Sequence, residues 1–240
     1  MMKTILLLPL CLFLCLPAGF AQCSGAGMEK LLFFLDDSTT AAAPKHLALG
    51  DSYTIGQGVT LEESFPYITS RILEEQGSKS VDLKYIATTG WTTRSLLSAI
   101  QKDTTNTYDV VTLLIGVNDQ FYGVDTAVYR LRFKQLLDKA NELAAFRPSR
   151  VFVLSIPDYS ETPFVAPHDK ERVRREIGWF NDINKQVTLR SGITYINITS
   201  LSREAANDSS LLAADQLHYS GKEHQKWAQL LAPLVKAALQ

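Results

Sequence analysis

The chain has 240 residues, of which 46% are hydrophobic and 20% are charged. This ordinary globular composition excludes wholesale disorder, a collagen-like repeat and a multi-span membrane protein, and the length suits one large domain or two small ones. Because 24 basic residues face 25 acidic ones, the formal net charge is −1, and the basic excess typical of nucleic-acid-binding proteins is missing.

Residues 1–22 are predicted to be a secretory signal peptide. Lys3 precedes an apolar run from Ile5 to Leu16, and small residues follow it. The run is shorter than the roughly 20 residues that a membrane-spanning helix needs. Two endings stay open: ordinary cleavage near Ala21, or a lipoprotein signal whose lipid acceptor is Cys23.

This leader sets the expected domain organisation and location. Residues 23–43 form an N-terminal leader segment, and residues 44–240 form one domain. The three cysteines all lie at or before Cys23, so the domain folds without thiol chemistry. We expect an exported protein that is periplasmic, extracellular or an outer-membrane lipoprotein, with membrane contact only through a lipid at Cys23.

From Lys45 onward, short apolar runs alternate with stretches of helical spacing. This pattern predicts an α/β domain whose parallel sheet is covered by helices on both faces. Valine, isoleucine and leucine dominate the runs, as expected of strands buried on both sides. The predicted strands are His46–Leu49, Val81–Ala87, Val110–Ile115, Val151–Ile156 and Thr194–Ile198.

Three longer segments repeat apolar residues at helical spacing and are predicted to be helices with one face toward the core. Pro233 is expected to bend the last helix or to start a new turn in it. The predicted core positions are Tyr129, Phe133, Leu136, Leu137, Ala140, Leu143 and Ala144 in the first, Val173, Ile177, Phe180, Ile183 and Val187 in the second, and Trp227, Leu230, Leu231 and Leu234 in the third.

Chemically capable residues follow the predicted strands, where ligands bind in such sheets. A serine nucleophile needs a base, and the base needs an orienting acid. Ser52 follows the first strand, and Asp215 lies three residues before His218 near the last helix. The backbone amides of Ser52 and Gly90 and the side-chain amide of Asn118 are three donors for an oxyanion. The sequence therefore predicts a serine hydrolase.

In this order, Gly50-Asp51-Ser52, Gly90 in Thr-Gly-Trp, Gly116-Val117-Asn118-Asp119 and Asp215-Gln-Leu-His218 resemble the four motif blocks of the SGNH, or GDSL, hydrolases. The resemblance implies a flavodoxin-like three-layer α/β/α sandwich with a central parallel sheet. It also implies a triad of Ser52, His218 and Asp215, an oxyanion hole from Ser52, Gly90 and Asn118, and neither cofactor nor metal.

The predicted activity is hydrolysis of carboxylic esters, including O-acyl groups on carbohydrate, through an acyl-enzyme on Ser52. Small-molecule, glycan and lipid esters all stay open as substrates, and Phe121, Tyr122 and Tyr159 are predicted to contact them. An acyltransferase, a lysophospholipase or a thioesterase would use the same triad. The non-enzymatic alternative is a carbohydrate- or lipid-binding module on an inactive scaffold. No Gly-x-Ser-x-Gly, complete dinucleotide-binding, phosphate-loop or His-Glu-x-x-His motif is present.

Overall fold

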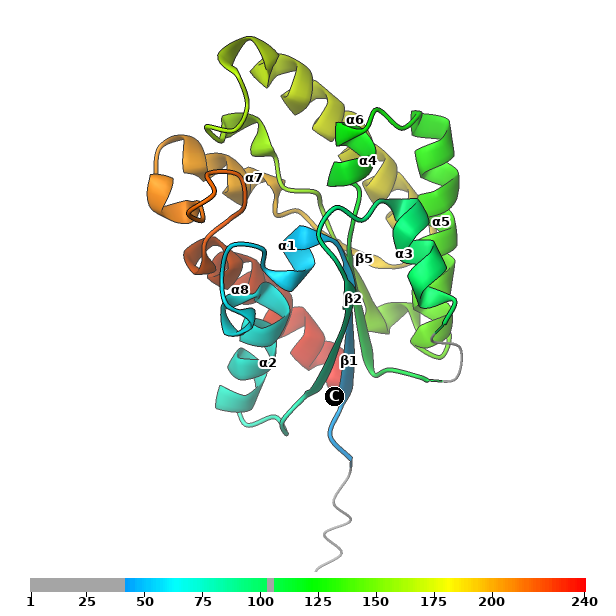
Figure 1. Ribbon diagram of the computed structural model, residues 1–240. Helices are drawn as coiled ribbons and strands as arrows, with labels where there is room; N and C mark the ends of the chain where they lie inside the picture. Colours follow the sequence, from blue (N-terminus) through cyan, green and yellow to red (C-terminus); the bar gives the residue numbers. More distant parts are fainter. Residues whose placement is uncertain (1–41, 103–105) are drawn as a thin grey trace, which may run out of the picture. The chain divides into compact units, whose positions relative to one another are not determined.

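Five parallel strands form the centre of the computed structural model, which describes residues 42–102 and 106–240 (Figure 1). Their order in the sheet is β2-β1-β3-β4-β5. The α/β fold with a parallel sheet that the sequence predicts is therefore confirmed. The strands are β1 (Lys45–Gly50), β2 (Asp82–Ala87), β3 (Val110–Leu114), β4 (Val151–Leu154) and β5 (Thr194–Ile196).

Helices cover both faces of this sheet and give the predicted three layers (Figure 1). On one face α2 (Phe65–Glu75) packs against α8 (Gly221–Leu239). On the other face α5 (Thr126–Leu143) packs between α3 (Thr93–Ile100) and α6 (Lys170–Arg190). Three short helices lie in the connections, namely α1 (Ser52–Ile55), α4 (Val117–Phe121) and α7 (Thr199–Ser202).

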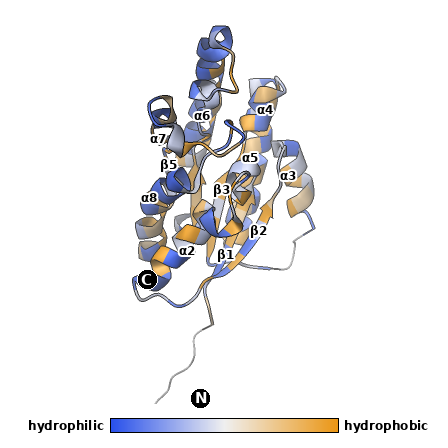
Figure 2. Ribbon diagram, turned by 60° about the vertical axis from the view of Figure 1, so that its left-hand side comes forward, coloured by the Kyte–Doolittle hydropathy of each residue, from blue (hydrophilic) through white to orange (hydrophobic). Residues whose placement is uncertain are grey.

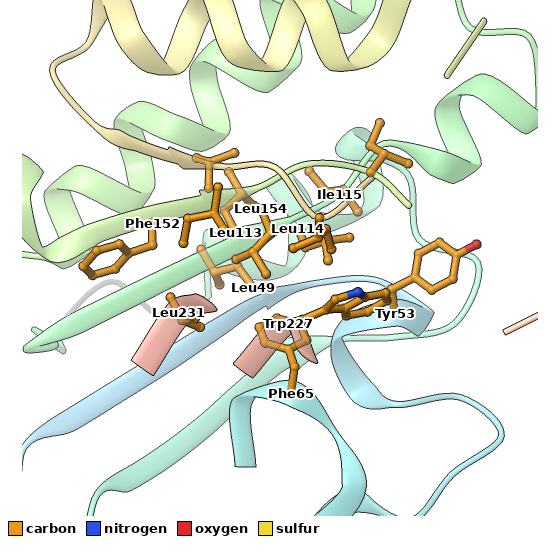
Figure 3. Packing of buried hydrophobic residues seen from close by; sticks show 14 of the residues in the cluster. Leu49, Tyr53, Phe65, Leu113, Leu114, Ile115, Phe152, Leu154, Trp227 and Leu231 are labelled. Carbon is orange, nitrogen blue, oxygen red and sulfur yellow. The ribbon is translucent and has the colours of Figure 1, made fainter. Parts of the chain in front are cut away.

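The core lies between the sheet and these helices. Leu49 of β1 and Leu113 of β3 are fully buried, because both strands are central in the sheet. Phe65, Trp227 and Leu231 cover them from α2 and α8, as Figure 3 shows. Figure 2 shows the strands mainly hydrophobic and α6 and α7 largely hydrophilic. Removing this apolar surface from water is the main force that holds the layers together.

The strand β2 is less buried than predicted. Asp82 and Lys84 are exposed, and no residue of this strand is fully buried. The sheet order explains the difference, because β2 is an edge strand with a neighbour on only one side. Charged side chains on an edge strand also discourage pairing with other chains.

The buried face of the last helix, α8, differs in part from the face that the sequence predicts. Trp227 and Leu231 are buried as expected, but Leu230 and Leu234 are exposed, and that part of the prediction is wrong. Ala228, Ala232 and Val235 are buried instead. The helix continues through Pro233 to Leu239.

Within residues 42–102 and 106–240, no helix combines the length and the apolar character that crossing a membrane would require.

A buried histidine couples α8 to α2. His224 is 1% exposed, and its Nδ1 accepts a hydrogen bond of 3.2 Å from the backbone amide of Phe65. Its ring stacks on Phe65 and meets Trp227 edge-on. Burial among these rings lowers the pKa of His224 to about 3. The folded protein therefore holds this imidazole neutral.

We expect His224 to make the fold sensitive to mild acid. In the unfolded chain this histidine takes up a proton as the pH falls through its ordinary pKa of 6.5, whereas the folded chain resists protonation until about pH 3. The lowered pKa therefore contributes stability above pH 6.5 that is lost as the pH falls, by about 2 kcal/mol between pH 7 and pH 5. Urea unfolding of His224→Asn, which keeps an acceptor near Phe65, should show a correspondingly smaller loss.

The exposed His168 provides the control. His168→Asn should lose as much stability as the wild type does when the pH falls from 7 to about 5. Parallel losses in the wild type and in His224→Asn would mean that His224 is already charged in the folded protein.

Candidate active site

The site lies at the carboxyl edge of the sheet, where β1 has β2 on one side and β3 on the other. In this strand order the chain connections after β1 and β3 diverge to opposite faces, which opens a crevice between them. A cavity of about 240 Å³ lies there, and we call it the catalytic cavity. Its lining consists of Ser52, Tyr53, Thr89, Gly90, Val117, Asn118, Phe121, Tyr122, Tyr159, Phe164, Leu217 and His218.

The predicted base and acid are in direct contact. His218 Nδ1 lies 2.6 Å from Oδ2 of Asp215, and Asp215 Oδ1 accepts the backbone amides of Leu217 and His218 at 3.0 and 2.9 Å. Burial alone would raise the pKa of Asp215, but these hydrogen bonds hold it below its ordinary value. The carboxylate is therefore ionised and fixes a proton on Nδ1, which leaves Nε2 free to accept one.

The nucleophile is placed by the short helix α1. Ser52 is its first residue, directly after Asp51, whose side chain accepts the amide of Tyr53 at 3.0 Å. The ring of Tyr53 meets the ring of His218 edge-on, with centroids 5.6 Å apart. Ser52 and His218 line the same cavity. Ser52 thus lines the same cavity as His218, which in turn contacts Asp215, and the triad stays a prediction.

Two loops carry the other predicted oxyanion donors and are tied to each other. Asn118 Nδ2 donates to the carbonyl of Trp91 at 2.9 Å, which fixes the orientation of this side-chain amide and leaves its second N–H available. Asp119 accepts both the amide and the hydroxyl of Thr93 at 2.7 and 2.6 Å. Gly90 has a φ of +80°, a conformation that other residues rarely adopt.

The loop after Ser52 contacts two neighbouring loops, one that carries Gly90 and one that carries Asp215. Gln57 Oε1 accepts the hydroxyl of Thr89 at 2.7 Å, which joins it to the Gly90 loop. Gly58 has a φ of +87°, and a Cβ there would lie 2.8 Å from the Cβ of Ala213, beside the carboxylate of Asp215. Only glycine allows the loop to approach Asp215 this closely. Ser52, the predicted oxyanion donors and Asp215 therefore lie on one connected set of loops.

A buried carboxyl directly precedes Ser52 in the chain. Asp51 is fully buried, and among the described residues its Oδ2 has no hydrogen-bond partner. Burial, together with the nearby carboxyl of Asp119, raises the pKa of Asp51 to about 8, against the effect of the amide of Tyr53. Asp51 is therefore mainly protonated at neutral pH. A neutral group here places no negative charge beside the amide of Ser52.

All three predicted substrate-contacting residues, Phe121, Tyr122 and Tyr159, line the catalytic cavity. Phe164 and Leu217 line it too and were not predicted. Phe164 lies in the long segment after β4, and the length of that connection was the available signal. His168 of the same segment is exposed and does not line this cavity.

Two groups of sequence predictions stand apart from this site. The predicted signal peptide at 1–22 and the predicted lipid acceptor Cys23 lie outside the described residues, as does most of the predicted leader segment at 23–43. In the part of the chain that the structure describes, no three side chains of histidine, cysteine, aspartate or glutamate are grouped to hold a metal ion.

Asp215, His218 and Ser52 lie at the carboxyl edge of a parallel α/β sheet. This arrangement is typical of serine hydrolases. The model of the GDSL-like Lipase/Acylhydrolase family matches residues 48–226. The chain therefore belongs to this family, and the protein is a carboxylic ester hydrolase. No protein among the curated sequences matches it.

Several solved structures share this fold. TesA superposes with a TM-score of 0.65 at 17% identity, covering 81% of this chain and 99% of TesA. The psychrotrophic esterase EstA from Pseudoalteromonas sp. gives 0.62 at 18%, with 82% and 98% covered. The acetyl xylan esterase AlAXEase gives 0.65 at 17%, with 80% and 99% covered. The chain thus spans nearly the whole of each of these folds.

Proposed function

We propose that this protein removes short acyl groups from carbohydrate esters through an acyl-enzyme on Ser52. The observation that carries the proposal is the catalytic cavity itself. Its volume of about 240 Å³ is smaller than the ~300 to 1,000 Å³ of pockets that enclose drug-sized ligands. A short acyl group fits such a volume better than a fatty chain. Aromatic rings at its wall offer flat apolar faces to a sugar ring.

Each step of the proposed reaction has a residue to carry it out. Ser52 Oγ attacks the ester carbonyl carbon while Nε2 of His218 takes its proton, and the oxyanion receives hydrogen bonds from Ser52, Gly90 and Asn118. His218 then gives that proton to the leaving alcohol as the C–O bond breaks. A water molecule attacks the acyl-enzyme, its proton passes to His218, and the carboxylic acid leaves as Ser52 regains its proton.

Substrate panels test the proposal. We expect kcat/KM on 4-nitrophenyl esters to fall as the acyl chain lengthens from acetate to decanoate, and we expect acetylated sugars to be hydrolysed. A preference for decanoate, for lysophospholipids or for acyl thioesters would contradict it. Transfer of the acyl group to added glycerol or sugar in place of water would identify an acyltransferase. An unlabelled Ser52 after treatment with a fluorophosphonate would indicate an inactive binding module.

Loss of the Asn118 side chain should slow the chemical step. Asn118→Ala removes one of three oxyanion donors, and removing such a donor lowers kcat by about 100-fold or more with little change in KM. Steady-state kinetics on 4-nitrophenyl acetate measures this. The exposed Asn207 supplies a control, because Asn207→Ala should retain the wild-type kcat. A main effect of Asn118→Ala on KM would place Asn118 in ground-state binding instead.

Export remains part of the proposal and depends on the composition of residues 1–22. An exported esterase would meet extracytoplasmic esters as substrates. Mass spectrometry of the mature N-terminus separates cleavage near Ala21 from a lipid on Cys23, and an intact Met1 in the mature protein would contradict export by a cleaved signal.

A further inference from the structure

Two further cavities continue from the catalytic cavity across the outer surface. The first, of about 230 Å³, shares Phe121, Tyr159 and Phe164 with the catalytic cavity. The second, of about 350 Å³, shares Phe121 with both and is also lined by Trp179 of α6. Figure 1 shows α4, which carries Phe121, beside α6. We call these two cavities together the outer groove.

The outer groove is lined by aromatic rings that the fold leaves half uncovered. Phe121, Phe164 and Trp179 are 54%, 52% and 51% exposed. Phe121 and Phe164 lie with ring centroids 6.4 Å apart, and the guanidinium of Arg175 lies 5.5 Å from the ring centre of Trp179. Exposed apolar side chains that gather in one place, rather than singly, mark a binding surface.

Charged side chains lie between these rings and are held in place. Arg172 donates to Asp169 at 3.0 Å and to Glu176 at 3.2 Å. The amide of Gln120 joins the hydroxyl of Tyr159 to Glu176, with distances of 2.9 and 2.7 Å. Gln120 and Arg172 line both cavities of the outer groove. The groove therefore combines flat apolar faces with fixed hydrogen-bonding groups.

This combination of apolar faces and hydrogen-bonding groups distinguishes between two possible occupants, a fatty acyl chain and a sugar. A fatty acyl chain laid along the groove would remove Arg172, Asp169 and Glu176 from water without returning hydrogen bonds, which is costly. A sugar presents C–H groups from its ring face to aromatic rings and hydroxyl groups to carboxylates and guanidinium groups. The aromatic rings and charged groups of the lining are therefore complementary to carbohydrate.

We propose that the outer groove binds further sugar units of an acylated oligosaccharide, with the unit that carries the acyl group at Ser52 and a more distant unit on Trp179. This inference rests on the proposed function. It assigns to Trp179 a role in selecting oligomers over monomers. Because Trp179 lines only the far cavity, the reaction of a single acylated sugar does not involve it.

The test compares Trp179→Ala with the wild type on chemically acetylated β-1,4-linked glucose and xylose series of one to six units. We expect wild-type kcat/KM to rise with length. In Trp179→Ala it should fall by about tenfold on the hexamers, mainly through KM, and stay unchanged on the monosaccharides. Leu189→Ala is the matched control, because Leu189 is on the same helix, is 56% exposed and lines none of the three cavities.

The outcomes separate the two proposals. If the wild type hydrolyses acetylated monosaccharides but gains nothing with length, or if Trp179→Ala matches the wild type on hexamers, the outer groove is not a sugar site and the proposed function stands. Equal losses on monosaccharides and hexamers would also overturn the groove, since they would indicate a structural role for Trp179. A wild type that hydrolyses only lipid or aryl esters would contradict the proposed function itself.

Discussion

Ser52→Ala should abolish ester hydrolysis while the protein stays folded. The change removes the atom that forms the acyl-enzyme, and the loss of a catalytic serine in a triad lowers kcat by about 10⁶-fold. Ser52 lies at the wall of the catalytic cavity and loses only its hydroxyl group, so the fold loses little. Initial rates on 4-nitrophenyl acetate and the urea midpoint, measured on the same preparation, test both halves of this expectation.

A matched control and a covalent probe sharpen the result. Ser98→Ala alters an exposed serine on α3 and should leave the rate unchanged. A fluorophosphonate should add its mass to the wild type on the peptide that contains Ser52 and should leave Ser52→Ala unlabelled. If Ser52→Ala kept even a hundredth of the activity, another nucleophile would have to be sought in the catalytic cavity.

The sequence predicts the sheet well because each strand is a short buried run with its own signal. All five predicted strands exist, and their bounds differ by at most two residues at each end. The position of Ser52 follows from the same logic, since it comes directly after a central strand. Composition alone does not show which strands are central in the sheet. For that reason the prediction that β2 is buried on both faces was wrong.

The site's supporting contacts could not be predicted from the sequence. The hydrogen bonds from Thr89 to Gln57 and from Asn118 to Trp91 join loops that are 32 and 27 residues apart. Such pairs depend on how the loops turn, and local spacing carries no information on it. His224 illustrates the same limit: its sequence neighbours indicate a polar helix face, yet tertiary packing against Phe65 buries it.

Trp179 was likewise absent from the predicted site. It lies one residue before Phe180, which is buried in the core, so helical spacing correctly places Trp179 off the core face but assigns it no partner. Only the arrangement of α4 beside α6 brings it into line with Phe121. Specificity beyond the reacting bond therefore depends on helix packing, whereas the catalytic groups depend on the ends of strands.

Asp215→Asn should disable the base without removing it. Asp215 Oδ1 accepts two backbone amides, and Oδ2 faces Nδ1 of His218. In the variant, the amide oxygen must stay with the two backbone N–H donors, so the new NH₂ group points at Nδ1. Nδ1 must then accept a hydrogen bond from this NH₂ group, so the ring proton moves to Nε2. A protonated Nε2 can no longer take the proton of Ser52. This change of tautomer costs about 10⁴-fold in kcat.

Kinetics and NMR together test this explanation. The ring ¹⁵N shifts of His218 should show Nδ1 protonated in the wild type and Nε2 protonated in Asp215→Asn, while the urea midpoints stay close. Asp208 offers a matched control, since it also caps a backbone turn through its side chain but pairs with Ser210 rather than with His218; Asp208→Asn should keep the wild-type kcat. If Asp215→Asn lost less than about tenfold, the orienting acid would be another group, or the new amide would have turned its oxygen from the backbone N–H groups to Nδ1.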